Sequence, residues 1–209
     1  MFQTVKQLIL ASGSPRRREL LEKLGISFSI VVPEIDESQL TGESAQDYVL
    51  RMAQIKGSDV GNRNPSAWIV SADTVVISDG QLLTKPETPE QAVEMLMLLS
   101  GREHQVQTGF CLSCLDEGVS IVDSCISLVR FKSFDITWAR SYVATGEPMD
   151  KAGGYGIQDR GGVLVQTVNG SYSNVVGLPL AETVDLLSRF GVVLSDGKES
   201  DGGEVADNG

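Results

Sequence analysis

The chain has 209 residues, of which 41% are hydrophobic, and a formal net charge of −11. This length and composition suffice for one globular domain, or two small lobes, with a buried core. The negative charge argues against broad binding to nucleic acid or to an acidic membrane, because such binding needs a continuous basic surface. A polyanionic ligand would therefore have to be met by a local cluster of cations.

The segment that begins at Leu8 predicts a strand, a tight turn and a helix. An apolar run over residues 8–11 precedes a Ser-Gly turn, and Ser14 followed by Pro15 is typical of a helix start. The first helical turn is positive already, so each cation there is disfavoured by about 0.3–1 kcal/mol. A bound anion such as phosphate would offset this cost, and a solvated basic turn is the alternative. Three cations crowd this turn, namely Arg16, Arg17 and Arg18.

The remaining chain alternates strand-like and helix-like patterns, which predicts an α/β fold. On the helix at 44–60 we expect Tyr48, Met52 and Ile55 to face inward, with Val49 as a further candidate. Strands are predicted at residues 27–32, 68–78, 105–115, 119–132 and 161–168, and helices at residues 44–60, 88–100, 135–145 and 179–190.

An Asp-Gly turn after Ser78 predicts a tight β-hairpin. If Ser78 pairs with Gln81, Lys85 lies opposite Thr74 and beside Asp73. A carboxylate and an ammonium inside an apolar sheet indicate a functional site, with a structural ion pair as the alternative. Strict alternation sends Asp73 and Thr74 to opposite faces, so both reach one cleft only near a strand end or a bulge.

Other polar segments could complete a ligand site. The acidic loop at 34–37 could offer oxygen ligands to a hard cation, although acidic loops are usually only solvated. Lys56 lies on a predicted helix and, judged by its pattern alone, is a surface lysine. The glycine-rich segment at 153–158 permits positive φ angles and close approach to a flat ligand, with a flexible loop as the alternative.

The cysteines and the single histidine carry little sign of catalysis. Cys111 and Cys114 form a C-x-x-C pattern inside a predicted strand, so we expect buried thiols rather than a redox dithiol. With Cys125 the chain has three cysteines, an odd number that cannot pair completely and that suits a reducing compartment. His104 is expected to be a polar residue at a strand start.

The ends of the chain complete the expected organisation. Residues 195–209 are rich in acidic residues and glycine, so we expect a disordered acidic tail after a single domain at 1–194. No basic leader and no apolar run of membrane-spanning length is present, so we expect a cytoplasmic protein that binds no membrane.

Several motifs, in order along the chain, resemble those of the Maf family. They are SGSPRR at 12–17, EIDE at 34–37, YVLR at 48–51 leading to Lys56, SADTVV at 71–76, TKP at 84–86, DKAGGYGIQ at 150–158 and GSYSNVVGLPL at 170–180. The resemblance covers nearly all of the chain except the tail. It implies an elongated mixed sheet with flanking helices and two lobes around a cleft, similar to the inosine triphosphatase fold. It also implies a metal-dependent house-cleaning pyrophosphatase for nucleoside triphosphates, commonly a homodimer.

The resemblance also implies a role for individual residues. Asp73 matches the catalytic aspartate of the family and, with Glu37, its site for Mg²⁺ or Mn²⁺. The chain resembles the branch that acts on dTTP and UTP; the alternatives are a pyrophosphatase for other modified nucleotides such as 7-methyl-GTP and a nucleotide-binding regulator of cell division. Asp159 departs from the family pattern, which has glycine there, and this leaves the fit of the nucleobase open. The positions that match substrate-binding residues are Ser12, Lys56, Lys85 and the three that separate the branches, Arg16, Thr74 and Gln158.

Overall fold

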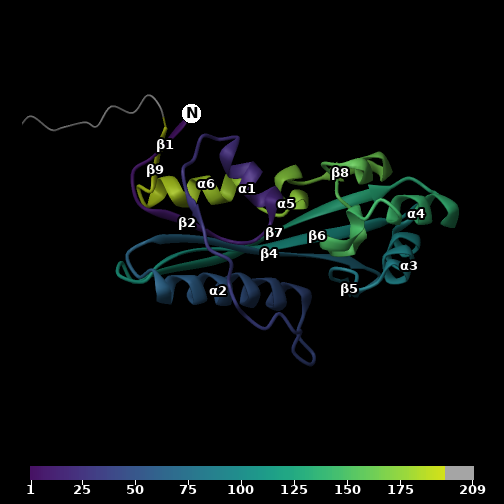
Figure 1. Ribbon diagram of the computed structural model, residues 1–209, viewed down its shortest axis with the longest axis horizontal. Helices are drawn as coiled ribbons and strands as arrows, with labels where there is room; N and C mark the ends of the chain where they lie inside the picture. The colour runs from purple at the N-terminus through teal and green to yellow at the C-terminus, as the bar shows by residue number, and fades with distance from the viewer. Residues whose placement is uncertain (196–209) are drawn as a thin grey trace, which may run out of the picture.

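The computed structural model describes residues 1–195, and these contain one long mixed sheet of seven strands (Figure 1). The strand order is β3-β2-β4-β6-β7-β8, with β5 paired to β4. β2 runs parallel to both of its neighbours, β3 and β4, and all other strand pairs in this sheet are antiparallel. The predicted α/β class and elongated sheet are confirmed. The strands are β2 (Leu8–Ala11), β3 (Ser29–Ile30), β4 (Trp68–Ser78), β5 (Gln81–Leu83), β6 (Glu103–Cys114), β7 (Val119–Phe131) and β8 (Val165–Asn169).

Helices cover both faces of this sheet (Figure 1). The helix α2 (Ala45–Arg63) lies along one face, while α1 (Pro15–Glu22), α5 (Tyr172–Val176) and α6 (Leu180–Arg189) lie on the opposite face. At the far end are α3 (Pro89–Leu99) and α4 (Ile136–Val143) with the short 3₁₀ helices η1 (Glu147–Asp150), η2 (Ala152–Gly154) and η3 (Arg160–Leu164). Among the described residues, no helix is both long and apolar enough to cross a membrane.

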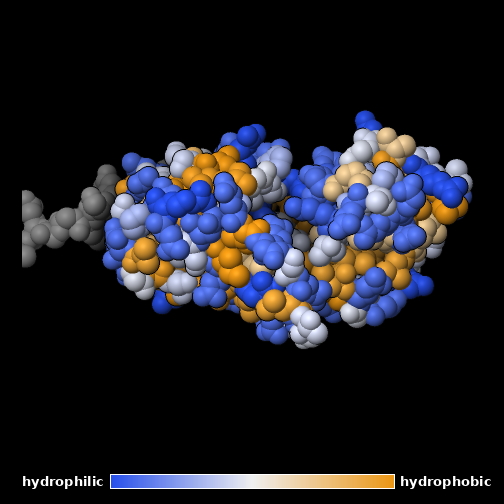
Figure 2. All heavy atoms as spheres, turned by 60° about the horizontal axis from the view of Figure 1, so that its bottom comes forward, coloured by the Kyte–Doolittle hydropathy of each residue, from blue (hydrophilic) through white to orange (hydrophobic). Residues whose placement is uncertain are grey.

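Two large apolar clusters give the molecule its two lobes. One lies under α1 and α6 and contains Leu10, Leu21 and Leu187. The other lies under α3 and α4 and contains Leu96 and Phe131. Burying one such side chain stabilises the fold by about 1.5–3 kcal/mol. Figure 2 shows a hollow between these two ends of the molecule, as the predicted two-lobed shape requires.

Several predicted elements differ from those observed. The strand at 27–32 is only two residues long, and the segment at 161–168 begins with η3 before β8 starts at Val165. Tyr48, Met52 and Val49 are buried, as predicted, but Ile55 is 37% exposed, and Lys56 takes its place on the face of α2 turned to the sheet. The helix α5 and the strands β1 (Phe2–Thr4) and β9 (Val193–Ser195) were not predicted.

The two ends of the described chain meet in a separate two-stranded sheet. β1 pairs antiparallel with β9, and Phe2 lies opposite Ser195. The predicted boundary of the tail is therefore one residue too early. The remaining residues of the predicted tail, 196–209, lie outside the described part of the chain.

The edge of the sheet beside β4 is open over a short stretch. β2 pairs with residues 68–71 of β4, and β5 pairs with residues 76–78. Among the described residues, no strand covers residues 72–75 on that side. The opening lies just beyond the C-terminal end of β2, which is the place where α/β sheets usually bind their ligands.

Two glycines allow α2 to lie close against the sheet. A Cβ atom on Gly109 of β6 would overlap the backbone of Val49 in α2. A Cβ atom on Gly57 of α2 would come within 2.9 Å of the Ser71 hydroxyl on β4. The absence of both Cβ atoms therefore brings the side chains of α2 within reach of β4.

Candidate active site

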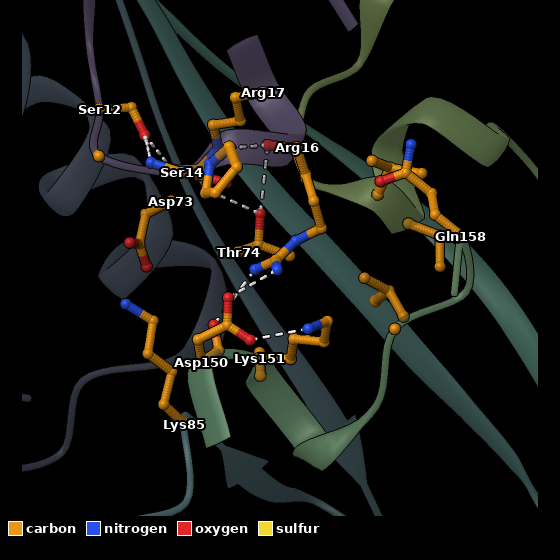
Figure 3. A pocket seen from close by; sticks show the side chains of 18 of the residues that line it. Ser12, Ser14, Arg16, Arg17, Asp73, Thr74, Lys85, Asp150, Lys151 and Gln158 are labelled. Atoms are coloured by element: carbon orange, nitrogen blue, oxygen red, sulfur yellow. Dashed lines mark hydrogen bonds and ion pairs between the residues drawn. The ribbon is translucent and has the colours of Figure 1, made fainter. Parts of the chain in front are cut away.

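A cavity of about 340 Å³ opens beside the uncovered stretch of β4 (Figure 3). Both lobes line it. The contributing segments are residues 11–17 after β2, residues 73, 74 and 76 of β4, residues 150–152 and 155–158, and residues 175–177. Glu37, Lys56 and Lys85 also line the cavity. The structure thus gathers every site residue expected from the resemblance around one cavity.

A buried ammonium joins the two carboxylates of this site. Lys56 is 6% exposed, and its Nζ donates a hydrogen bond of 2.6 Å to Oδ1 of Asp73. The same Nζ lies 2.8 Å from Oε1 of Glu37. The prediction of a surface lysine, made from the helix pattern alone, is wrong. The close approach of α2 to the sheet places Lys56 against β4.

The ionisation of Glu37 responds to these neighbours. Its partial burial raises the pKa, while the hydrogen bond and the charge of Lys56 lower it. Lys85 and Arg17 lower the pKa of Glu37 further, so the net shift is downward. Glu37 is therefore held as a carboxylate.

The hairpin register is confirmed, but its predicted extension is wrong. Ser78 pairs with Gln81, as the Asp-Gly turn predicts, and the ladder ends where Val76 pairs with Leu83. Beyond that point the carbonyl of Thr84 accepts a hydrogen bond from Gly153 N instead of from β4. Lys85 consequently does not pair with Thr74. It is exposed at the cavity, and Figure 3 shows its ammonium group directed toward Asp73.

Asp73 and Thr74 point to opposite faces of a regular strand, as alternation requires. Asp73 meets Lys56 on the α2 side, and Thr74 accepts a hydrogen bond of 3.1 Å from Arg17 NH2 on the α1 side. No bulge interrupts the pairing of β4 with β6 at these positions. Both residues reach one cavity because the sheet edge is open here.

The three clustered arginines have separate environments. Arg18 is exposed and lies near Glu22, which makes it the solvated member of the cluster. Arg16 reaches across the cavity, where NH1 donates 2.8 Å to Oδ2 of Asp150 and NH2 donates 3.1 Å to its carbonyl oxygen.

Arg17 is the functional candidate that the sequence did not single out. It is 9% exposed, and its guanidinium donates to the Gly177 carbonyl, the Ser12 hydroxyl and the Thr74 hydroxyl. These acceptors are uncharged, and burial lowers the pKa of Arg17. A buried cation with neutral partners is suited to an anionic ligand in the cavity. Its place in the Arg cluster was visible in the sequence, but its burial was not.

The turn between β2 and α1 forms the N-terminal wall of the cavity. Ser12 is buried, and its hydroxyl accepts a hydrogen bond of 3.2 Å from Ser14 N. Pro15 begins α1, as predicted, and Ser14 has the extended backbone of an N-cap, but its side chain makes no capping hydrogen bond. Free N–H groups at a helix start, beside arginines, favour a phosphate group.

Gln158 lies at the other end of the cavity from Asp73 and Lys85 (Figure 3). Its Oε1 atom is buried and has no hydrogen-bond donor among the described residues. Gly153 and Gly154 have φ angles of +68° and +71°, which confirms the expected positive φ in this segment. Asp159 has a φ of −106°, so this departure from the family pattern does not strain the backbone.

The chemistry of Glu37 and Asp73 fits a divalent cation. Hard cations prefer carboxylate oxygens, and Lys56 engages only one oxygen of each carboxylate, Oε1 and Oδ1. No group of three or more His, Cys, Asp or Glu residues suited to a metal occurs among the described residues. Phosphate oxygens of a ligand would have to supply the remaining coordination.

The histidine and the cysteines lie away from this chemistry. His104 is buried near the start of β6, and its Nε2 lies 2.8 Å from the Tyr155 hydroxyl. Cys111 and Cys114 are buried free thiols, as predicted, and Cys125 is partly buried. None of these four residues lines the cavity.

The fold and the site define an α/β protein with a charged cleft between two lobes. A family profile described as Maf-like protein matches residues 7–190. The dTTP/UTP pyrophosphatase of Desulfotalea psychrophila is 49% identical over 193 residues, 92% of this chain and 99% of that protein. The dTTP/UTP pyrophosphatase of Myxococcus xanthus is 48% identical over 90% of this chain and 94% of that protein. The chain belongs to the Maf family.

Among solved structures, one that aligns with part of this chain is much less similar in sequence. A Ham1 protein of Staphylococcus aureus aligns with 60% of this chain and 72% of its own, with a TM-score of 0.43 and 13% identity. Such an overlap adds nothing to the assignment.

Proposed function

We propose that this protein is a nucleoside triphosphate pyrophosphatase that hydrolyses dTTP and UTP to the monophosphate and pyrophosphate. The observation that carries this proposal is the set of cations around one cavity, Lys56, Lys85 and Arg17, which face the carboxylates of Asp73 and Glu37. Such a set suits a triphosphate chain and a water molecule that attacks it. The names of the relatives support dTTP and UTP as substrates, and modified pyrimidine nucleotides are included in the proposal.

The charged end of the cavity would hold the triphosphate. Lys85, Arg17 and the turn at Ser12 would neutralise its oxygens and stabilise the pyrophosphate leaving group. Asp73 would orient a water molecule and accept its proton, as the water oxygen bonds to the α-phosphorus and the bond from that phosphorus to the bridging oxygen breaks. The hydrogen bond from Lys56 to Oδ1 holds the Asp73 side chain in place and leaves Oδ2 to face the water molecule.

Glu37 and Asp73 would hold a divalent cation, Mg²⁺ or Mn²⁺, which would supply further neutralisation of the phosphate oxygens when bound. The carboxylate oxygens that Lys56 leaves unengaged support this assignment.

The other end of the cavity would select the nucleobase. The unpaired Oε1 of Gln158 can accept a hydrogen bond from the ring N–H that uracil and thymine share. Arg16 and Thr74, between the two ends in Figure 3, would complete this selection. A base that leaves a buried polar group unpaired is strongly disfavoured.

A panel of nucleotides tests the proposal. Phosphate release in the presence of added inorganic pyrophosphatase is measured for dTTP, UTP, 5-methyl-UTP, pseudo-UTP, 7-methyl-GTP, GTP, ATP and ITP. The kcat/KM values for dTTP and UTP should be similar to each other and exceed those for the purine nucleotides. Faster turnover of 7-methyl-GTP would favour the branch for other modified nucleotides. Release from none of them, with Mg²⁺ or Mn²⁺ present, would favour a nucleotide-binding regulator of cell division.

The cellular setting is part of the same proposal. We propose that the protein acts in the cytoplasm, as a house-cleaning enzyme on free nucleotides, and forms a homodimer. The resemblance of its motifs to those of the Maf family supports both points. The net charge of −11 agrees with a small-molecule substrate rather than a nucleic acid.

A further inference from the structure

Arg16 is fixed in place by a single residue on the opposite side of the cavity. Its NH1 and NH2 groups donate to a side-chain oxygen and to the main-chain oxygen of Asp150, at 2.8 and 3.1 Å. Two bonds to one residue define both the position and the plane of a guanidinium group. Arg16 stands at the start of α1 and Asp150 ends η1, so the pair spans the mouth of the cavity (Figure 3).

Asp150 is itself held from behind by a buried lysine. Lys151 is 8% exposed, and its Nζ donates 2.7 Å to Oδ1 of Asp150 and 2.8 Å to the carbonyl oxygen of Glu147. Each carboxylate oxygen of Asp150 thus has its own cation. Partial burial raises the pKa of Asp150, but the bonds from Lys151 and Arg16 bring it below its ordinary value. The carboxylate therefore keeps its charge at neutral pH and can orient Arg16.

The same short helix also anchors the loop that carries Gln158. Oε1 of Glu147 accepts hydrogen bonds from the Tyr142 hydroxyl at 2.6 Å and from Gly161 N at 3.0 Å. The Tyr142 hydroxyl in turn accepts a bond of 3.1 Å from Gly156 N. The backbone is thus tied down on both sides of Gln158 by the element that holds Arg16.

We propose that Asp150 is a positioning residue for nucleobase selection. Its carboxylate, which Lys151 holds in place, orients the guanidinium group of Arg16. This inference rests on the proposed function and deepens it. An exposed arginine on its own samples many rotamers, and the bonds to Asp150 remove that freedom before a nucleotide binds. Arg16 can then present its remaining N–H groups in one geometry.

A double-mutant cycle tests this role. The variants D150A, R16A and the double variant are compared with the parent chain, using kcat/KM for UTP and for GTP. D150A should lower kcat/KM for UTP about tenfold or more, the scale of one charge-assisted hydrogen bond, and change the value for GTP less than about twofold. In the R16A background, D150A should change the value for UTP less than about twofold. D150N keeps an acceptor oxygen and should retain part of the preference for UTP.

The matched control is D79N, which removes the negative charge of an exposed aspartate that pairs with Arg102 outside the cavity. It should leave both kcat/KM values unchanged, and thermal melting of each variant confirms folding. Equal losses for UTP and GTP in D150A, or effects of R16A and D150A that multiply in the double variant, would overturn the inference. The parent chain tests the proposed function separately, because a failure of that proposal appears as no hydrolysis before any substitution is made.

Discussion

The central contact of the site is the pair formed by Lys56 and Asp73. Their side chains are 7% and 12% exposed, so water does little to weaken their attraction. Removing one member of a buried pair usually leaves an uncompensated charge. Here Glu37 offers Lys56 a second carboxylate partner. A neutral substitution of Asp73 should therefore affect chemistry more than folding.

Asp73→Asn should lower kcat for UTP by at least about 10²-fold, because it removes the group that accepts the proton of the attacking water. The asparagine keeps an acceptor oxygen for Lys56, so the melting temperature should change little. Steady-state kinetics at saturating metal measure the effect, and Asp116→Asn, in an exposed turn, is the control. Turnover near that of the parent chain would contradict the assignment of Asp73.

Removal of divalent cations should abolish turnover of UTP, because in the proposed mechanism a divalent cation held by Glu37 and Asp73 neutralises the phosphate oxygens. The protein is treated with EDTA, dialysed, and assayed before and after addition of Mg²⁺ or Mn²⁺. Full activity after chelation would contradict a metal-dependent mechanism. Glu37→Gln should raise the metal concentration needed for half-maximal activity.

At the scale of elements, the site depends on how closely α2 approaches the sheet. Gly109 lies directly opposite Asp73 in the ladder of β4 and β6. The position has no room for a Cβ atom, because the backbone of α2 occupies that space. The distance from α2 to the sheet therefore decides whether Lys56 can reach Asp73.

Gly109→Ala should destabilise the protein by about 1–3 kcal/mol, since backbone cannot move aside as a side chain can. It should also lower kcat, because α2 carries Lys56. Gly61→Ala is the matched control. The space at Gly61 accommodates a Cβ at ordinary contact distance, and alanine favours the helix by up to about 1 kcal/mol, so this variant should be slightly stabilised. Urea unfolding measures the stability of both variants. If neither variant is less stable than the parent chain, the packing argument is refuted.

His104 connects β6 to the segment that leads to Gln158, through the Tyr155 hydroxyl. Burial lowers the pKa of His104 from 6.5 to about 4. Between these two values the unfolded chain binds a proton that the folded chain does not. The free energy of unfolding should therefore fall by about 1.4 kcal/mol for each unit that the pH is lowered through this window.

His104→Gln removes this titration, because glutamine does not ionise in that range. The stability of the parent chain relative to this variant should decrease from pH 7 to pH 4.5, as measured by urea unfolding at intervals of half a pH unit. A constant difference across this range would show that His104 does not titrate between the two states.

At the scale of the whole molecule, the expected homodimer is a separate question from the site within one chain. Large apolar side chains are exposed in and after β3, namely Ile30 (43%), Val32 (57%) and Leu40 (58%). Covering such side chains in an interface would be favourable. Sedimentation equilibrium should give twice the chain mass of 22.4 kDa. Protein concentrations from about 1 to 100 μM cover the range usually examined for such association. The mass of a single chain at all of them would contradict the homodimer.

The sequence alone determined the local features of this protein. The turn chemistry of the Asp-Gly pair predicted the register at Ser78, and the Ser14-Pro15 pair predicted the start of α1. Both follow from interactions among residues that are near neighbours in the chain. The motif resemblance added the family, the elongated α/β fold and the identities of the residues around the cleft.

Only the tertiary structure decided which of these residues meet. Helical periodicity cannot tell that Lys56 faces a carboxylate on β4, because that depends on glycines in two distant elements, Gly57 and Gly109. Alternation along a strand cannot tell that Asp73 and Thr74 share a cavity, because the opening in the sheet edge arises where two other strands end. In the same way Arg16 and Arg17 diverge toward distant partners, Asp150 and Gly177. These contacts join residues far apart in sequence, so packing rather than local pattern determines them.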